Sequence, residues 1–278
     1  MTRIVSKIQT INIMRKIFQY ILMTVAVVAT ASCSSELDEV LQPAGNGTLR
    51  FVVSDFPAFG ESPDTRVIGT LDVGKTAWDK DDQIIVTLTS KKFGAQNAVL
   101  TYNGTSWSTA VSFLYLDNET PAVSAIYAPC YEVTEEGAMQ LRSGMQLGMT
   151  EYIPANCSFA NDAVSINFAE VTRNYSRLRI VADAGQELTV TTTDFTPAGA
   201  TDVTTASYTL TTDNNGNAFL YGTFAEGATV SVKQGNVPLI DYAFTTEKNP
   251  GGTESGKSYA LDARPVIDGT SGGETAAE

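Results

Sequence analysis

The chain has 278 residues, 43% of them hydrophobic, and its 18 basic and 31 acidic residues give a net charge of −13. A chain this acidic is poorly suited to bind a phosphate backbone, so no nucleic-acid partner is expected. The sequence contains no histidine, which excludes Ser-His-Asp and Cys-His nucleophiles and zinc sites built on imidazole. We therefore expect a protein that is not an enzyme, with no catalytic residue, metal or cofactor.

Residues 1–32 carry the three-part pattern of a secretory signal peptide. Arg15 and Lys16 precede an apolar run over 17–29, which small residues connect to Cys33. The run is too short for a membrane-spanning helix, which needs about 20 apolar residues. Met14 is an alternative start of the signal peptide.

The segment around Cys33 resembles a bacterial lipobox, although Thr30 stands where leucine is common. In a lipobox the cysteine is acylated and becomes the first residue of the mature chain. We therefore expect Cys33 to carry the lipid and residues 33–47 to form a polar, lipidated tether. An anchor of two or more acyl chains gives stable attachment to a membrane.

The rest of the chain consists of short runs rich in β-branched and aromatic residues, separated by turn formers. Five runs precede a loop-like middle over 143–158, and eight follow it. About thirteen short strands favour an all-β fold of antiparallel sandwiches. We expect two domains and a short tail: an N-terminal β-sandwich over 48–160, a C-terminal β-sandwich over 161–267 and a disordered acidic tail over 268–278.

Local patterns add detail to this expectation. Asn103-Gly104 and Asn215-Gly216 each lie between strand-like runs, where they favour type I′ hairpin turns. Along 175–180 a tyrosine and two arginines alternate with Ser, Leu and Ile. This alternation predicts one packed face and one solvated face for the strand. The run over 110–116 is also predicted to be a strand.

Cys130 and Cys157 are the two remaining cysteines of the chain. They could form one disulfide in an oxidising compartment, or they could be two small buried hydrophobic side chains. A nucleophilic cysteine would need an activating neighbour that this chain does not supply.

Three further motifs have plain structural interpretations. The DNNGN run at 213–217 resembles the start of a calcium loop, but Phe224 occupies the position of the required glutamate, so a tight turn is the better interpretation. The carboxylates of WDKDDQ, at 78–83, lie too close together for a glycosidase pair and are expected to be solvated. Trp78 and Trp107 would stack on sugars if they were exposed, but packing in a sandwich is the commoner role.

The order of several motifs resembles the fimbrillin-like surface lipoproteins of the type V pilin superfamily, found in Gram-negative gut and oral anaerobes. The resemblance spans roughly 48–265 and includes DTRVIG, WDKDDQIIV, TYNGTSW and AVSAIYAP. Two departures are Asp81, where many relatives have glycine, and Ala169-Glu170, where a histidine is common. The matching positions are Trp78, Asp82, Tyr102, Gly104, Trp107, Tyr127, Pro129 and Phe168.

This resemblance implies two tandem transthyretin-like β-sandwiches and a structural or accessory subunit of adhesive fimbriae, at the tip or anchor. In polymerising relatives, an arginine-specific protease cuts the loop after the first strand, and a strand from a neighbouring subunit fills the vacated groove. Arg66 is the preferred cut site, because it is the only basic residue of the Pro- and Gly-containing segment at 57–69. Arg50 is the alternative, but it lies within a strand-like run.

The implied partners are other fimbrial subunits or further copies of this chain, a host or glycan ligand, and outer-membrane lipid through Cys33. The implied location is the outer membrane and the cell surface. The tail over 268–278 is Gly-rich, acidic and nearly without apolar residues, which makes it a poor donor strand and favours an accessory subunit. The alternative function is a surface lipoprotein that does not polymerise and binds glycans or host ligands.

Overall fold

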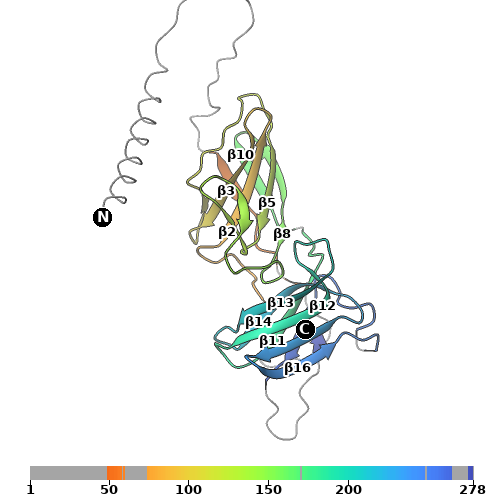
Figure 1. The fold of residues 1–278 in the computed structure, drawn as a ribbon. Coiled ribbons are helices and arrows are strands. Elements are labelled where there is room, and N and C mark those ends of the chain that lie inside the picture. The colour runs from red at the N-terminus through yellow and green to blue at the C-terminus, as the bar shows by residue number, and fades with distance from the viewer. Residues whose placement is uncertain are drawn as a thin grey trace, which may run out of the picture. The chain divides into compact units, whose positions relative to one another are not determined.

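The structure is a computed structural model that describes residues 49–57, 59, 74–169, 171–247, 249–264 and 275–277. The secondary structure of these residues consists of strands, so the expected all-β fold is confirmed (Figure 1). Within these ranges no helix has the length and apolar character needed to cross a membrane. The expected signal peptide, the tether, Cys33 and Arg66 lie outside the described residues.

The first part of the described chain forms a five-stranded and a three-stranded sheet. The five-stranded sheet has the order β4-β3-β2-β5-β8, with β2 (Gln83–Ser90), β3 (Gly94–Tyr102), β4 (Trp107–Ser108), β5 (Ala122–Tyr127) and β8 (Ile153–Pro154). The three-stranded sheet has the order β1-β10-β9, with β1 (Arg50–Val53), β9 (Asn156–Ala160) and β10 (Ala163–Asn167).

The two sheets share one buried core, here called the first cluster. Successive side chains of a strand point to opposite faces, so every second residue of β2 and β10 enters the cluster. The cluster runs on to Phe168, past the predicted boundary between 160 and 161. Its buried members are Phe56, Ile84, Val86, Leu88, Ala98, Leu100, Phe113, Tyr115, Ala125, Tyr127, Ile153, Val164, Ile166 and Phe168.

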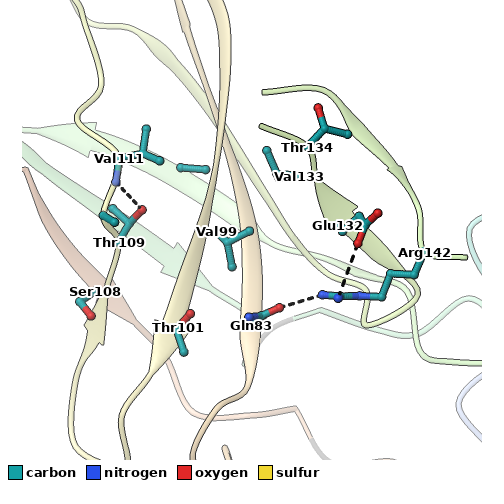
Figure 2. Close-up of a pocket in the computed structure, with 12 residues that line it drawn as sticks. Gln83, Val99, Thr101, Ser108, Thr109, Val111, Glu132, Val133, Thr134 and Arg142 are labelled. Atoms are coloured by element: carbon teal, nitrogen blue, oxygen red, sulfur yellow. Dashed lines mark hydrogen bonds and ion pairs between the residues drawn. The ribbon is translucent and has the colours of Figure 1, made fainter. Parts of the chain in front are cut away.

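A hairpin of β6 (Tyr131–Val133) and β7 (Met139–Leu141) lies beside β2 and β3 (Figure 2). Arg142, directly after β7, holds this hairpin in place: its Nη2 donates to Oε1 of Gln83 over 2.8 Å. The predicted strand over 110–116 is not formed. Instead, the Gln96 side chain bonds both backbone groups of Leu114, donating to its oxygen over 2.7 Å and accepting from its nitrogen over 2.8 Å.

The second part of the described chain forms an eight-stranded sheet with the order β16-β15-β12-β14-β11-β17-β18, in which β13 also pairs with β12. The strands are β11 (Ser176–Val181), β12 (Glu187–Pro197), β13 (Thr204–Thr211), β14 (Asn217–Phe224), β15 (Thr229–Gln234), β16 (Val237–Ala243), β17 (Ser258–Asp262) and β18 (Thr275–Ala277).

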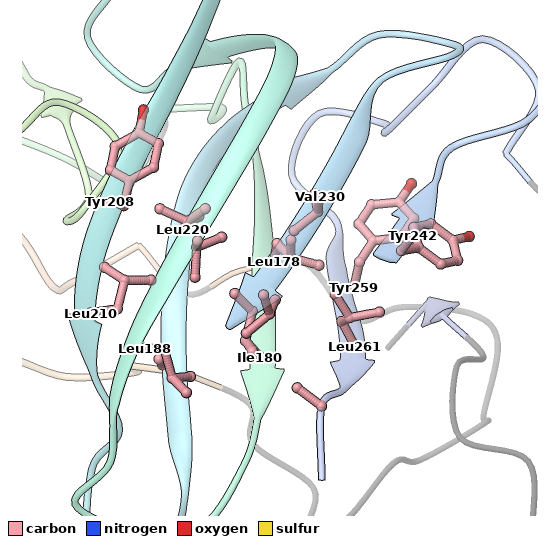
Figure 3. Close-up of a cluster of buried hydrophobic side chains, with 14 of the residues drawn as sticks. Leu178, Ile180, Leu188, Tyr208, Leu210, Leu220, Val230, Tyr242, Tyr259 and Leu261 are labelled. Atoms are coloured by element: carbon pink, nitrogen blue, oxygen red, sulfur yellow. The ribbon is translucent and has the colours of Figure 1, made fainter. Parts of the chain in front are cut away.

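One irregularity lets β12 pair with three strands. Its register shifts between Thr192 and Phe195, where Asp194 adopts a positive φ of 48°. Before the shift β12 lies between β13 and β15, and after it β12 pairs with β14. A bulge bends a strand and increases its twist. The sheet can therefore wrap around one core, here called the second cluster (Figure 3). Its buried members are Leu178, Ile180, Ala182, Leu188, Val190, Phe195, Tyr208, Leu210, Ala218, Leu220, Phe224, Ala228, Val230, Val232, Tyr242, Phe244, Tyr259, Leu261 and Ala263.

Strand β11 corrects the prediction of one packed and one solvated face. All six of its residues are buried, including Arg177 and Arg179 at 2% and 0% exposure. The Leu178 face lies in the second cluster, and on the other face Arg177 contacts the ring of Phe59. Local alternation could not show that residues distant in sequence would cover this second face.

Strand β18 and the turn at Asn103-Gly104 also differ from expectation. Residues Thr275–Ala277 lie in the predicted tail, yet they pair with β17, since strand pairing needs only backbone groups. Asn103-Gly104 does lie in the hairpin between β3 and β4, but Asn103 caps a four-residue turn by accepting from the nitrogens of Thr105 and Ser106, both over 2.9 Å. At 213–217, Asp213 accepts from the nitrogens of Asn215 and Asn217, as expected of a tight turn.

Candidate functional site

The candidate site is the place where β1 pairs with β10. The two strands run parallel, with Arg50 opposite Ala163 and Val53 opposite Ile166. β10 is the central strand of its sheet, whereas β1 pairs with no other strand among the described residues. β1 is therefore an edge strand that can leave without separating β10 from β9.

Successive side chains of β1 point alternately toward the first cluster and toward solvent. Leu49, Phe51 and Val53 pack against the first cluster, whereas Val52 is 58% exposed. Phe56, beyond the strand, is 5% exposed and belongs to the cluster itself. Burying a side chain such as Val, Leu or Phe contributes about 1.5–3 kcal/mol. Loss of this strand would consequently open an apolar slot beside an unpaired edge of β10.

Ser54 fixes the end of β1 through several hydrogen bonds. Its nitrogen donates to the oxygen of Ile166 over 2.9 Å, and its Oγ accepts from the nitrogen of Phe168 over 2.8 Å. Its carbonyl oxygen accepts from Nε1 of Trp78 over 2.8 Å. These bonds place Ser54 between β10 and the turn that precedes β2.

Phe59 joins the same segment to the arginine face of β11. Its ring centroid lies 4.0 Å from Cζ of Arg173 and 5.4 Å from Cζ of Arg177. The rings of Tyr175 and Tyr221 lie 6.2 and 6.4 Å away. Guanidinium groups at these distances from a ring are attracted to its face. We call residues 49–57 together with Phe59 the first segment, since they make both sets of contacts.

The described structure tests the predicted cut sites only in part. Arg50 is exposed but is the first residue of β1, and its nitrogen donates to the oxygen of Asp162 over 3.1 Å. A residue held in a ladder is a poor protease substrate. Arg66 itself lies outside the described residues, so its cleavage stays a prediction.

Both cysteines of the described chain are free thiols. Cys130 is buried and Cys157 is half-buried. Burial raises the pKa of each thiol above its ordinary value. A thiol with a raised pKa is a weak nucleophile at neutral pH, so neither cysteine has the properties of a catalytic group.

The two tryptophans pack against other aromatic rings. Trp78 and Trp107 meet edge to face at 4.9 Å, and Trp78 also contacts Phe56, Tyr127 and Phe168 at 4.8 to 5.4 Å. Both are half-buried beside the first cluster. They serve the packing role that the sequence favoured over a sugar-stacking platform.

The carboxylates of WDKDDQ form part of a turn stabilised by Lys75. Its Nζ contacts Asp79 and lies 2.8 Å from Oδ2 of Asp82. Burial lowers the pKa of Lys75, but hydrogen bonds to Asp79 and Asp82 outweigh that effect and raise it above the usual value. Within the described residues, no group of three or more His, Cys, Asp or Glu side chains is placed to hold a metal ion.

Sequence reasoning missed the contacts that follow the first strand. Phe59 was included in the cleavable segment but was given no contact, and Glu151 was not singled out at all. The structure shows Glu151 accepting from Nε of Arg173 over 2.6 Å, and both residues are buried. One signal was present: Phe59 is the only aromatic residue of the segment at 57–69.

No family model and no curated protein sequence matches the chain. Among solved structures it is similar to a candidate cell adhesion protein from Bacteroides fragilis NCTC 9343, with 11% identity and a TM-score of 0.35, over 83% of this chain and 96% of that chain. A candidate cell adhesion protein from Bacteroides eggerthii DSM 20697 has 9% identity and a TM-score of 0.36, over 82% and 94% of the two chains.

The fimbrial anchor protein Mfa2 from Porphyromonas gingivalis has 11% identity and a TM-score of 0.28, over 68% of this chain and 85% of that chain.

Proposed function

We propose that the protein is a cell-surface lipoprotein of the fimbrillin type and an accessory subunit, at the tip or anchor, of adhesive fimbriae. In this proposal it carries lipid on Cys33 in the outer membrane. It binds other fimbrial subunits, or copies of itself, by strand exchange and has no enzymatic activity. The observation that supports it is the pairing of β1 with a single neighbour, β10, at the edge of a three-stranded sheet.

The proposed mechanism begins with a cut after Arg66. The cut separates the first segment covalently from β2 and everything that follows. When the segment leaves, β10 loses the pairing partner at one of its two edges, and the first cluster loses Phe56. Unpaired strand edges beside apolar pockets accept an added strand whose side chains alternate in the same way.

The accessory role is supported by the C-terminal end of the sequence. Residues 268–278 contain almost no apolar side chains that could fill such a slot in a neighbour. In addition, Thr275–Ala277 pair with β17 of their own chain. A segment of this composition is a poor donor strand, which favours an accessory subunit over a stalk subunit.

The test uses the chain from residue 34 onward, which has no lipid, and an arginine-specific protease. We expect intact-mass analysis to show a chain that begins at Val67. We also expect a synthetic peptide with the sequence of residues 48–59 to raise the melting temperature of the cut protein, because it refills the slot beside β10. A peptide with Phe51 replaced by Asp is the matched control, since a charge would enter the apolar slot.

The variant Arg66→Lys keeps the charge but removes the cut site. It should stay intact under the same protease. The proposal fails if the cut protein keeps its stability without the first segment, or if the two peptides stabilise it equally.

A further inference from the structure

A groove of about 540 Å³ lies on the face of β2, β3 and β4 that points away from the first cluster (Figure 2). Val99 and Thr101 form its floor, because they alternate along β3 with Ala98 and Leu100 of the first cluster. Residues 108–111 form one wall, and the β6–β7 hairpin with Arg142 forms the other. The volume falls within the roughly 300–1,000 Å³ of small-molecule sites.

Arg142 is held rigidly at the edge of this groove. Its Nε donates to the oxygens of Pro129 and Tyr131, both over 3.0 Å, and its Nη2 donates to Oε1 of Gln83 over 2.8 Å. Its Nη1 lies 3.9 Å from Oε2 of Glu132, and the two side chains are 40% and 38% exposed. A separation of 3.9 Å is too long for a direct hydrogen bond, but a single oxygen can bridge it.

Other polar groups of the groove also have unused hydrogen-bonding capacity. The hydroxyl groups of Thr101 and Ser108 make no hydrogen bond to the residues that the structure describes, and both line the groove. A hydroxyl can donate one hydrogen bond and accept two. The groove thus combines a fixed cation, a carboxylate and two hydroxyls with the aliphatic side chains of Val99 and Val111.

The arrangement discriminates between classes of ligand. A ligand anion would be repelled by the carboxylate of Glu132, and a ligand cation would be repelled by the guanidinium of Arg142. An apolar ligand would remove water from these groups without giving them hydrogen-bond partners. A neutral ligand with several hydroxyls satisfies all of the groups.

We propose that this groove binds a neutral saccharide through adjacent hydroxyl groups, one of which accepts from Nη1 of Arg142 and donates to Oε2 of Glu132. A second hydroxyl bonds to Thr101 and Ser108, while the C–H face of the sugar packs on Val99 and Val111. The inference does not depend on strand exchange. It applies to the uncut monomer, so its test and that of the proposed function give separate results.

The experiment measures binding of neutral trisaccharides built from glucose, galactose, mannose or N-acetylglucosamine to the uncut chain, by saturation-transfer NMR. We expect at least one of them to bind, and to lose binding after periodate oxidation, which cleaves adjacent diols. The double variant T101V/S108A should weaken binding about tenfold, because two hydrogen bonds of ordinary strength are lost.

Two substitutions of alanine by tryptophan distinguish binding in the groove from binding elsewhere on the surface. Ala110→Trp, at an exposed wall residue, fills the groove and should abolish binding. Ala122→Trp, at an exposed position of β5 outside the groove, should leave binding unchanged. Circular dichroism verifies that each variant is folded. The proposal is overturned if no trisaccharide binds, if A110W still binds, or if an acidic sugar such as sialyllactose binds more tightly than every neutral one.

Discussion

Glu151 is a buried acidic residue, 7% exposed, that is held by two side chains preceding β11. Nε of Arg173 donates to its Oε2 over 2.6 Å, and the hydroxyl of Tyr175 donates to the same oxygen over 3.1 Å. Arg173 is 5% exposed. Both charges of this pair are therefore shielded from water, and each lies against the opposite charge.

The substitution Glu151→Gln should lower the free energy of unfolding by about 3 kcal/mol. Glutamine keeps the shape of the side chain but removes the negative charge that faces the buried guanidinium, and removal of one member of a buried pair costs about 3–5 kcal/mol. Urea denaturation followed by circular dichroism measures the change. Glu135→Gln, at an exposed turn residue, is the control and should stay within about 0.5 kcal/mol of the parent. If Glu151→Gln and Glu135→Gln were equally stable, the buried pair of Glu151 and Arg173 would not stabilise the fold.

At the scale of elements, β1 depends on hydrogen bonds to one neighbour. Backbone nitrogens of Arg50 and Ser54 donate toward β10, to the oxygens of Asp162 and Ile166. Donors of a strand point alternately to its two sides, so the nitrogen of Val52 also faces β10. The Val52 side chain is 58% exposed and contributes little to the core.

Val52→Pro should weaken the attachment of β1, whereas Val52→Thr should not. Proline removes the ladder donor at the centre of the four-residue strand, and threonine keeps both the donor and the β-branched shape. We expect V52P to raise the rate of amide exchange at Val164 and Ile166 at least about tenfold, which corresponds to roughly 1.4 kcal/mol. V52T should match the parent. Protection that is unchanged in V52P would show that side-chain packing alone holds β1.

The strands were largely predictable because the signal for a strand is local. Alternation over β2 and β12, and turn formers between the runs, indicated an all-β chain directly. Pairing partners were not predictable: β1 and β10 are parallel neighbours although more than a hundred residues separate them. The polar strand β9, Asn156–Ala160, was missed because its alternation of Cys and Phe with Asn, Ser and Ala resembles a loop.

The candidate site was predictable only in outline. The apolar alternation over 49–56 indicated a first strand, and its position before a Pro- and Gly-containing segment indicated where a cut could free it. The contacts of Phe59 with Arg173 and Arg177 join residues more than a hundred positions apart, so no local pattern records them. The groove beside Arg142 likewise exists only once β6 lies next to β2 and β3.

At the scale of the whole molecule, tyrosines set the response to alkaline pH. Burial raises the pKa of Tyr208 to about 12, and burial together with a hydrogen bond to Asp162 raises that of Tyr115 to about 12. Burial also raises the pKa values of Tyr127, Tyr131, Tyr175 and Tyr259. In the unfolded chain these groups titrate near pH 10.

Stability should therefore be constant up to about pH 9.5 and fall between about pH 10 and 12. In that interval the unfolded chain releases phenolic protons that the folded chain retains, so rising pH favours unfolding. Urea denaturation at intervals of pH measures the slope. Tyr115→Phe removes one titrating group and should reduce the slope by up to one proton between pH 10 and 12. A slope identical to that of the parent would show that Tyr115 titrates as freely in the folded chain as in the unfolded one.

The bond between Trp78 and Ser54 gives the protein an optical property of its own. The chain has two tryptophans, both beside the first cluster, and the second cluster contains none. Departure of the first segment would break the bond to the indole N–H, remove the ring of Phe56 at 4.8 Å and admit water to the indole. The emission of the protein would then shift to longer wavelength. Without any added dye, a fluorimeter could follow how many molecules still hold their first segment during maturation, second by second.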